Sequence, residues 1–394
     1  MVEWKKIWEV TTWDKKFQGV DKSMQNKIIH YPYLLAKDLF ALSVPNGNVK
    51  LLSTGAEEGW TTKEVAGKFL CKGEIVSIPW GKSPGAKNPV KYYNGYFVTG
   101  DNRIATSANK DVLNNRFLYY WLLNNSDLLE TFYRGAGIQH PSMYMVLNMD
   151  VPIPSLSEQT RIVGILDTFT ASIESLKEQI AQRRKQYEYY RDQLLDFEGK
   201  DGVEMITLSE IGKCYAGATP STKIDLYWEN GTIPWMSSGE VHQGIVTHTS
   251  SFITQAGYDN ASTKMLPIGT IVIALAGQGK TRGSVAITAI ELCTNQSLCG
   301  IVIVKNNIIN KYVYYYLRTQ YNNLRRISSG EGTRGGLNLK MVGSYPIPIP
   351  SISEQSRIVS ILDTFEASIS NLEAQLKERE KQYEYYRNKL LTFE

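Results

Sequence analysis

Residues 270–281, TIVIALAGQGKT, come close to a loop that binds the phosphates of a nucleotide. Such a loop reads G-x-x-x-x-G-K-[ST], and its glycines let backbone N–H groups surround the phosphates. Gly279, Lys280 and Thr281 fit, but Ala274 replaces the first glycine. The residues that follow, RGSVAITAI, are typical of a strand, whereas a phosphate loop opens a helix. The sequence therefore disfavours an ATPase, and a nucleotide hydrolase using Lys280 is kept as an alternative.

Other reactive side chains show no spacing that would form a metal site or a catalytic group. The histidines lie far from the cysteines, and no two cysteines form a C-x-x-C pair. These residues are His30, His140, His242, His248, Cys71, Cys214, Cys293 and Cys299. Unpaired thiols are typical of a reduced compartment, and no apolar run is long enough to span a membrane. We therefore expect a cytoplasmic protein without a metal site or a membrane partner.

An internal repeat organises the chain. Residues 154–198 and 350–394 are identical at 30 of 45 positions without a gap. Chance does not give such identity, so the chain is a tandem duplication. Each repeated segment follows a longer, more divergent one of about 150 residues.

Both repeated segments read as long helices. Ser155 and Glu158 have capping-box spacing, as do Ser351 and Glu354. Apolar residues then recur in alternating steps of four and three, which is typical of a coiled coil. An unpaired seam would face water, so we predict that the two helices pack as an antiparallel coiled coil. The predicted seam residues are Ile162, Leu166, Phe169, Ile173, Leu176, Ile180, Tyr187, Tyr190, Leu194, Phe197, Ile358, Leu362, Phe365, Ile369, Leu372, Leu376, Tyr383, Tyr386, Leu390 and Phe393.

Four polar residues of the helices have predicted places as well. Arg183 and Arg379 interrupt the seam, where they either help to set the register or extend out of it. Asp167 and Asp363 are interpreted as parts of a solvated helix face.

The divergent segments carry short β-branched runs such as GTIVIAL and GSVAITAI, broken by glycine, asparagine and proline. Each also holds one helix candidate, so we predict an α+β fold with mostly β cores. The expected boundaries are globular domains at 1–153 and 204–349, helices at 154–198 and 350–394, and a linker at 199–203. Each domain has a net charge of +4 and each helix segment, the first counted with the linker, one of −2. The basic domains favour a polyanionic partner.

The whole chain resembles the specificity (S) subunit of type I restriction–modification enzymes. The junctions VPIPSLSEQTRI and PIPIPSISEQSRI carry the resemblance most strongly, together with two copies of QYEYYR. GEGTRGGLNLKMVGSYPIPIP and ATPSTKIDLYWENGTIPWMS are similar to that family's target-recognition domains. The resemblance implies a non-catalytic subunit that reads a split sequence in double-stranded DNA. Its helices would act as a spacer between the two readers.

The resemblance also implies partners and cofactors. Two modification (M) subunits would bind S-adenosylmethionine and methylate adenine, and restriction (R) subunits using ATP and Mg²⁺ could join them. No cofactor is expected in this chain. Tyr189 and Tyr385 lie off the seam, so we predict that they contact the M subunits. A coiled-coil scaffold without a role on DNA is the second alternative.

Side chains with donors in loops are the candidates for reading bases, because Arg and Lys pair with guanine, and Asn and Gln with adenine. A phosphate contact or an ordinary surface position is the competing interpretation for each of them. The candidates are Lys82, Lys87, Asn102, Arg103 and Gln139 in the first domain, and Gln278, Lys280, Thr281, Arg282, Asn295, Gln296 and Arg334 in the second.

Overall fold

The computed structural model describes residues 2–55, 57–83, 90–200, 202–277, 280–328 and 336–393. Its contacts divide the chain into two compact units. Unit 1 comprises Met1–Glu178 and Ala374–Glu394, and unit 2 comprises Gln179–Glu373. Each unit therefore holds one globular domain and parts of both long helices, so its boundaries fall inside the helices and not at the predicted domain ends.

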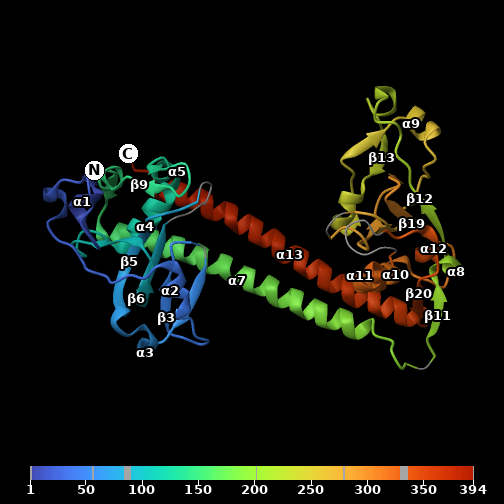
Figure 1. The fold of residues 1–394 in the computed structure, drawn as a ribbon, viewed down its shortest axis with the longest axis horizontal. Helices are drawn as coiled ribbons and strands as arrows, with labels where there is room; N and C mark the ends of the chain where they lie inside the picture. The colour runs from blue at the N-terminus through green and yellow to red at the C-terminus, as the bar shows by residue number, and fades with distance from the viewer. Residues whose placement is uncertain are drawn as a thin grey trace. The chain divides into compact units, whose positions relative to one another are not determined.

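A six-stranded sheet forms the centre of unit 1, with strand order β2-β7-β5-β6-β3-β4. Figure 1 labels its strands β3, β5 and β6. All neighbours are antiparallel except β3 and β6. Its strands are β2 (Thr11–Trp13), β3 (Val49–Leu52), β4 (Glu58–Thr61), β5 (Cys71–Pro79), β6 (Lys91–Thr99) and β7 (Asn102–Ser107). The helices are α1 (Ile7–Val10), α2 (Ala36–Ala41), α3 (Lys63–Ala66), α4 (Asn115–Asn124), α5 (Ser126–Glu130) and α6 (Met143–Leu147), with short 3₁₀ turns η1 (Lys22–Gln25) and η2 (Gly67–Phe69).

The main sheet of unit 2 repeats this arrangement, with strand order β12-β19-β16-β17-β14. A second sheet, β15-β13-β18, extends the domain. The strands are β12 (Gly212–Ala216), β13 (Ile233–Met236), β14 (Ile245–Val246), β15 (Ser251–Ile253), β16 (Ile271–Ala274), β17 (Val285–Thr288), β18 (Cys293–Thr294) and β19 (Leu298–Ile303). The helices are α8 (Leu208–Ile211), α9 (Gln255–Asn260), α10 (Asn310–Thr319), α11 (Tyr321–Ile327) and α12 (Leu339–Gly343), with 3₁₀ turns η3 (Asp225–Tyr227) and η4 (Ser238–Gln243). The shared order β2-β7-β5-β6-β3 and β12-β19-β16-β17-β14 extends the duplication to the domains, and the predicted α+β fold is confirmed.

A short two-stranded antiparallel ladder joins the first and last strands of each domain, just before the long helix begins. β1 (Glu3–Lys6) pairs antiparallel with β10 (Asp150–Ile153), and β11 (Glu204–Thr207) pairs in the same way with β20 (Pro346–Ile349). A further small pair joins β8 (Tyr133–Arg134) to β9 (His140–Pro141). The proline-rich junctions of the sequence are therefore strands whose partners lie at the start of the same domain.

The two long helices, α7 (Leu156–Leu194) and α13 (Ile352–Leu390), have the predicted antiparallel pairing. In unit 1 the rings of Phe169 and Tyr386 stack, with centroids 5.3 Å apart. In unit 2 Phe365 and Tyr190 repeat this contact at 5.5 Å. The first part of one helix thus lies beside the last part of the other within each unit (Figure 1).

Most predicted seam residues are buried or half-buried, but the seam differs from the prediction at two places. Tyr190 and Tyr386 remain 47% and 41% exposed, because each ring stacks on a phenylalanine of the other helix and does not fill the space between the two helices. Near the helix ends Leu195 and Leu391 are buried, while the predicted Leu194 and Leu390 are only half-buried. The change follows from the domains, whose cores these leucines enter.

The seam arginines lie against aromatic rings. The guanidinium of Arg379 lies 5.6 Å from the ring centroid of Phe169, and that of Arg183 lies 5.8 Å from that of Phe365. A planar cation over a ring gains a cation–π interaction while it keeps contact with water. Both arginines therefore cap the aromatic stacks at matching positions of the duplication.

Candidate nucleic-acid interface

The segment that resembles a phosphate loop is the turn of a β-hairpin. β16 ends at Ala274, and β17 begins at Val285 and pairs with it antiparallel. Lys280 is exposed in the connection, and its carbonyl accepts hydrogen bonds from Tyr321 Oη at 2.9 Å and Ser284 Oγ at 3.1 Å. A helix that would face a bound phosphate does not follow the loop. The geometry of a nucleotide-hydrolase site is therefore missing at Lys280.

Three candidate base-reading side chains of the first domain are buried and engaged within it. The ammonium of Lys82 pairs with the Glu130 carboxylate and lies 5.0 Å from the centroid of the Tyr133 ring. The Asn102 amide donates to the carbonyl of Leu52 at 2.9 Å. These bonds hold loops in place, so the structure counts against Lys82 and Asn102 as side chains presented to a ligand.

Arg103 is the third buried candidate, at 6% exposure. Its Nη1 donates to Asp101 at 2.8 Å, and its guanidinium lies 3.9 Å from the centroid of the Trp80 ring. His140 covers Trp80 as well, with ring centroids 4.7 Å apart. Its burial and its contacts with Asp101 and Trp80 count against Arg103 as a base reader, although its Nε has no hydrogen-bond partner among the described residues.

The loop beside this aromatic stack brings two sequence candidates together. Backbone hydrogen bonds of 3.0 and 2.9 Å join Lys82 and Gln139, and the Gln139 side chain is partly exposed. A cavity of about 390 Å³ lies nearby, with Lys15, Lys16, Trp80, Arg103 and Tyr144 in its lining. Gln139 thus remains the described candidate of the first domain whose side chain reaches solvent, while Lys87 lies outside the described residues.

The second domain presents its candidates unevenly. Lys280 and Gln296 are exposed, Thr281 and Asn295 are half-buried, and Arg282 is buried at 6% exposure. The Asn295 side chain accepts from the backbone N–H of Ser297 at 3.1 Å, which orders its turn. The burial of Arg282 counts against it as a base reader. Gln278 and Arg334 lie outside the described residues.

A buried glutamine anchors each long helix to its domain, and the sequence analysis missed it. Gln159 is fully buried: its amide accepts from the N–H of Asn114 at 2.8 Å and donates to the carbonyls of Val112 and Pro154 at 2.9 Å. Gln355 is equally buried. Its amide accepts from Ile309 N–H at 2.9 Å and donates to the carbonyls of Asn307 and Pro350 at 3.2 and 2.9 Å. The signal that could have found this pair is the identical glutamine that ends the Ser-Glu-Gln tripeptide in both repeated segments.

The helix starts also correct one local prediction. Ser155 accepts from the N–H of Glu158 at 3.3 Å, which is half of a capping box. The Glu158 carboxylate instead takes two hydrogen bonds from Arg161, at 2.7 and 2.6 Å. The bidentate arginine is a stronger partner than one backbone N–H, so the reciprocal half of the box does not form.

The side chains of Asp167 and Asp363 are 43% and 37% exposed but also contact the domains, so their interpretation as a solvated face is only partly right. Asp167 accepts from Arg116 Nε at 2.8 Å and from Tyr120 Oη at 2.5 Å. Asp363 accepts from Tyr315 Oη at 2.6 Å and pairs with Lys311, and both of these partners lie on α10. Burial and the neighbouring carboxylate raise the pKa of both phenols. Each phenol therefore stays a proton donor that ties α4 or α10 to a long helix.

Tyr189 and Tyr385 are exposed at 62% and 58%, on the outer side of the helices. Each touches the next tyrosine edge to face, with centroids 5.4 and 5.3 Å apart. Exposed rings at matching positions agree with the predicted partner contact, which stays a prediction.

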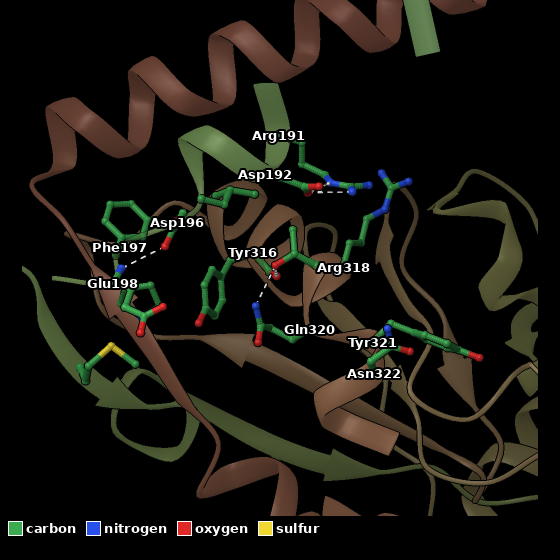
Figure 2. A pocket seen from close by; sticks show the side chains of 14 residues that line it. Arg191, Asp192, Asp196, Phe197, Glu198, Tyr316, Arg318, Gln320, Tyr321 and Asn322 are labelled. Carbon is green, nitrogen blue, oxygen red and sulfur yellow. Dashed lines mark hydrogen bonds and ion pairs between the residues drawn. The ribbon is translucent and has the colours of Figure 1, made fainter. Parts of the chain in front are cut away.

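A cavity of about 850 Å³ lies at the end of α7 in unit 2 (Figure 2). Arg191 pairs there with Asp192 at 2.7 Å, and Tyr316, Phe197 and Met205 contribute apolar surface. In unit 1 the equivalent place holds larger rings that pack together: Trp121 lies 5.7 Å from Trp4 and 6.3 Å from Phe393. Met205 and Tyr316 occupy the positions that Trp4 and Trp121 hold in unit 1, so smaller side chains leave the cavity in unit 2. Its lining mixes both signs of charge, so it is no phosphate site.

Two absences among the described residues limit the chemistry. No group of three or more His, Cys, Asp or Glu side chains in the described ranges could hold a metal ion. No described helix is long and apolar enough to cross a membrane.

Comparison with known proteins agrees with this architecture. The family model of the type I restriction modification DNA specificity domain matches residues 37–183 and 200–381. The chain is 36% identical over 305 residues to the type I restriction enzyme EcoR124I/EcoR124II specificity subunit of Escherichia coli, covering 74% of each protein.

Two solved structures share the fold. The type I restriction–modification S subunit from M. genitalium has a TM-score of 0.67 and 18% identity, covering 100% of this chain and 97% of that one. A chain from a study of complex assembly and conformational transition of the type I R-M system has a TM-score of 0.57 and 16% identity, covering 99% and 97%. The chain belongs to the type I restriction–modification DNA specificity family.

Proposed function

We propose that this chain reads a split, asymmetric sequence in double-stranded DNA, with one half-site for each domain. It is a specificity subunit and not a catalytic one. The supporting observation is an uneven duplication. The anchors Gln159 and Gln355 are identical and make matching bonds, whereas the loops beside the sheets differ. Two domains that have different loops but are anchored to their helices in the same way suit two different half-sites.

Base reading is assigned to side chains that reach solvent. Gln139 in the first domain and Lys280 and Gln296 in the second fit this requirement best among the described residues. Gln pairs with adenine and Lys with guanine in the major groove. Lys87, Gln278 and Arg334 complete the proposed set on sequence grounds.

The catalytic cofactors belong to partners. Two M subunits would bind S-adenosylmethionine and methylate adenine, and R subunits would use ATP and Mg²⁺. Tyr189 and Tyr385 are the proposed contacts to the M subunits, because each ring is exposed on a helix that both units share. Replacing both with alanine should weaken co-purification of M without changing the bases that are read.

A domain exchange tests the proposal directly. Residues 204–349 are replaced by the second domain of another family member, and methylated adenines are mapped across the genome. We expect one half of the motif to change and the other half to persist. A continuous motif, a perfect palindrome in the parent, or a change of both halves in the chimera would contradict the proposal.

A further inference from the structure

Two exposed lysines in unit 1 converge on one tyrosine. The ammonium of Lys63 lies 3.9 Å from the centroid of the Tyr96 ring, and that of Lys72 lies 5.1 Å from it. Lys63 opens α3, Lys72 lies on β5 and Tyr96 lies on β6, so three elements build the cluster. We call these three residues the lysine–tyrosine cluster.

The fold fixes the position of each member. Lys72 and Tyr96 face each other directly in the β5–β6 ladder. α3 is capped by Thr62, whose side chain accepts from the Val65 N–H at 3.4 Å, and Ala66 is buried beneath it. The Tyr96 ring packs against the small core under α2 and α3. Packing therefore fixes the backbone positions of both lysines, and each ammonium group lies against the same ring.

Such an arrangement favours an anion. Two like charges near one ring repel, and a ligand carrying negative charge would relieve that repulsion. Their field already lowers the pKa of the Tyr96 phenol, chiefly through Lys63 and then Lys72. The nearest carboxylate along the chain, Glu64, is exposed and hydrogen-bonded to its own helix start, where Thr62 holds it.

The geometry points to the lysine–tyrosine cluster as a contact for the phosphate backbone of DNA that flanks the half-site, because Lys72 lies at the start of β5 and the Lys82–Gln139 pair follows the end of that strand. This inference rests on the proposed function. Lys and Tyr side chains are regular partners of DNA phosphates, and such contacts set register without carrying sequence. By the strand registers, the equivalent of Lys72 in the second domain is Pro267, which carries no charge, so the contact belongs to one half of the chain.

The experiment measures DNA binding by the complex of full-length chain and M subunits. The probes are a fluorescent duplex carrying the mapped methylation motif and a random duplex of equal length, each titrated at several salt concentrations. The variant Lys63→Gln/Lys72→Gln should bind both probes about thirtyfold more weakly at 0.15 M salt if each lysine neutralises one phosphate. The slope of log affinity against log salt should fall by about 1 to 2. The methylated motif should not change.

Two matched variants separate this contact from a loss of charge or of folding. Lys6→Gln/Lys110→Gln removes two lysines of the same unit that already pair with carboxylates, Asp150 at 2.7 Å and Glu74 at 3.0 Å. It should leave affinity and slope near those of the parent. Lys63→Arg/Lys72→Arg keeps both charges and should retain most of the binding.

Other outcomes overturn the inference in distinguishable ways. An unchanged affinity and slope in Lys63→Gln/Lys72→Gln, with a parent that prefers its motif, removes the cluster from the interface and leaves the proposed function standing. Loss of M-subunit binding without DNA, at an unchanged salt slope, would assign the cluster to an acidic protein segment instead. A parent complex with no preference for any duplex would refute the proposed function itself.

Discussion

Replacing Gln159 with leucine should loosen the joint between the first domain and α7. Leucine keeps roughly the volume of glutamine but has no hydrogen-bonding groups. It would leave the N–H of Asn114 and the carbonyls of Val112 and Pro154 without their side-chain partner. Each such group in a buried site costs about 1–3 kcal/mol, and less where water can reach it.

The expected loss of unfolding free energy is therefore about 2–5 kcal/mol, since only the bond to Pro154 is fully buried. The assay is urea unfolding followed by hydrogen exchange and mass spectrometry, which resolves units 1 and 2 separately. Exchange should rise in the peptides around residues 109–118 and 154–162, while those around Gln355 keep their protection. Gln182→Leu, at an exposed position of the same helix, is the matched control.

A destabilisation below about 0.5 kcal/mol, the range of ordinary surface substitutions, would refute this reasoning. So would an equal rise of exchange in both units. Either result would mean that apolar contacts, and not the glutamine, hold the helix to the domain.

Three further predictions concern the helices and unit 2. Lys177→Glu should cost about 1 kcal/mol by opposing Glu380, its partner at 3.3 Å, and Glu380→Lys should restore the loss in a double-mutant cycle measured by urea unfolding; additive losses would contradict the pairing. Burial raises the pKa of Glu240, but hydrogen bonds from Ser250 and Ser237 lower it overall, so the stability that Glu240 contributes is present above its ordinary pKa of 4.5 and is lost as the pH falls below that value. Glu240→Gln should flatten this acid dependence of the thermal unfolding temperature. An unchanged pH profile would mean that other carboxyl groups cause the acid dependence. Inserting four residues after Ala181 adds about 6 Å of helix, which should lengthen the unspecified gap of the methylated motif by about one or two base pairs; an unchanged gap in an active mutant would show that the helices are not the spacer.

The sequence alone determined the duplication, the long helices and their antiparallel pairing. These features follow from local periodicity and from the need to cover an apolar stripe, and both can be counted along the chain. It also disfavoured a phosphate loop, because the residues after Lys280 have a strand pattern and not a helix pattern, and the hairpin of β16 and β17 then removed that alternative.

The tertiary structure decided which polar residues were free to act. Lys82, Asn102 and Arg103 looked like loop donors, yet Glu130, Leu52 and Trp80 occupy them from distant parts of the chain. Asp167 looked solvated, yet Tyr120, from the domain, binds it. A polar side chain has the same letter whether it faces water or a buried partner. Its role depends on which groups the fold brings within hydrogen-bond distance, and that information lies outside its local sequence.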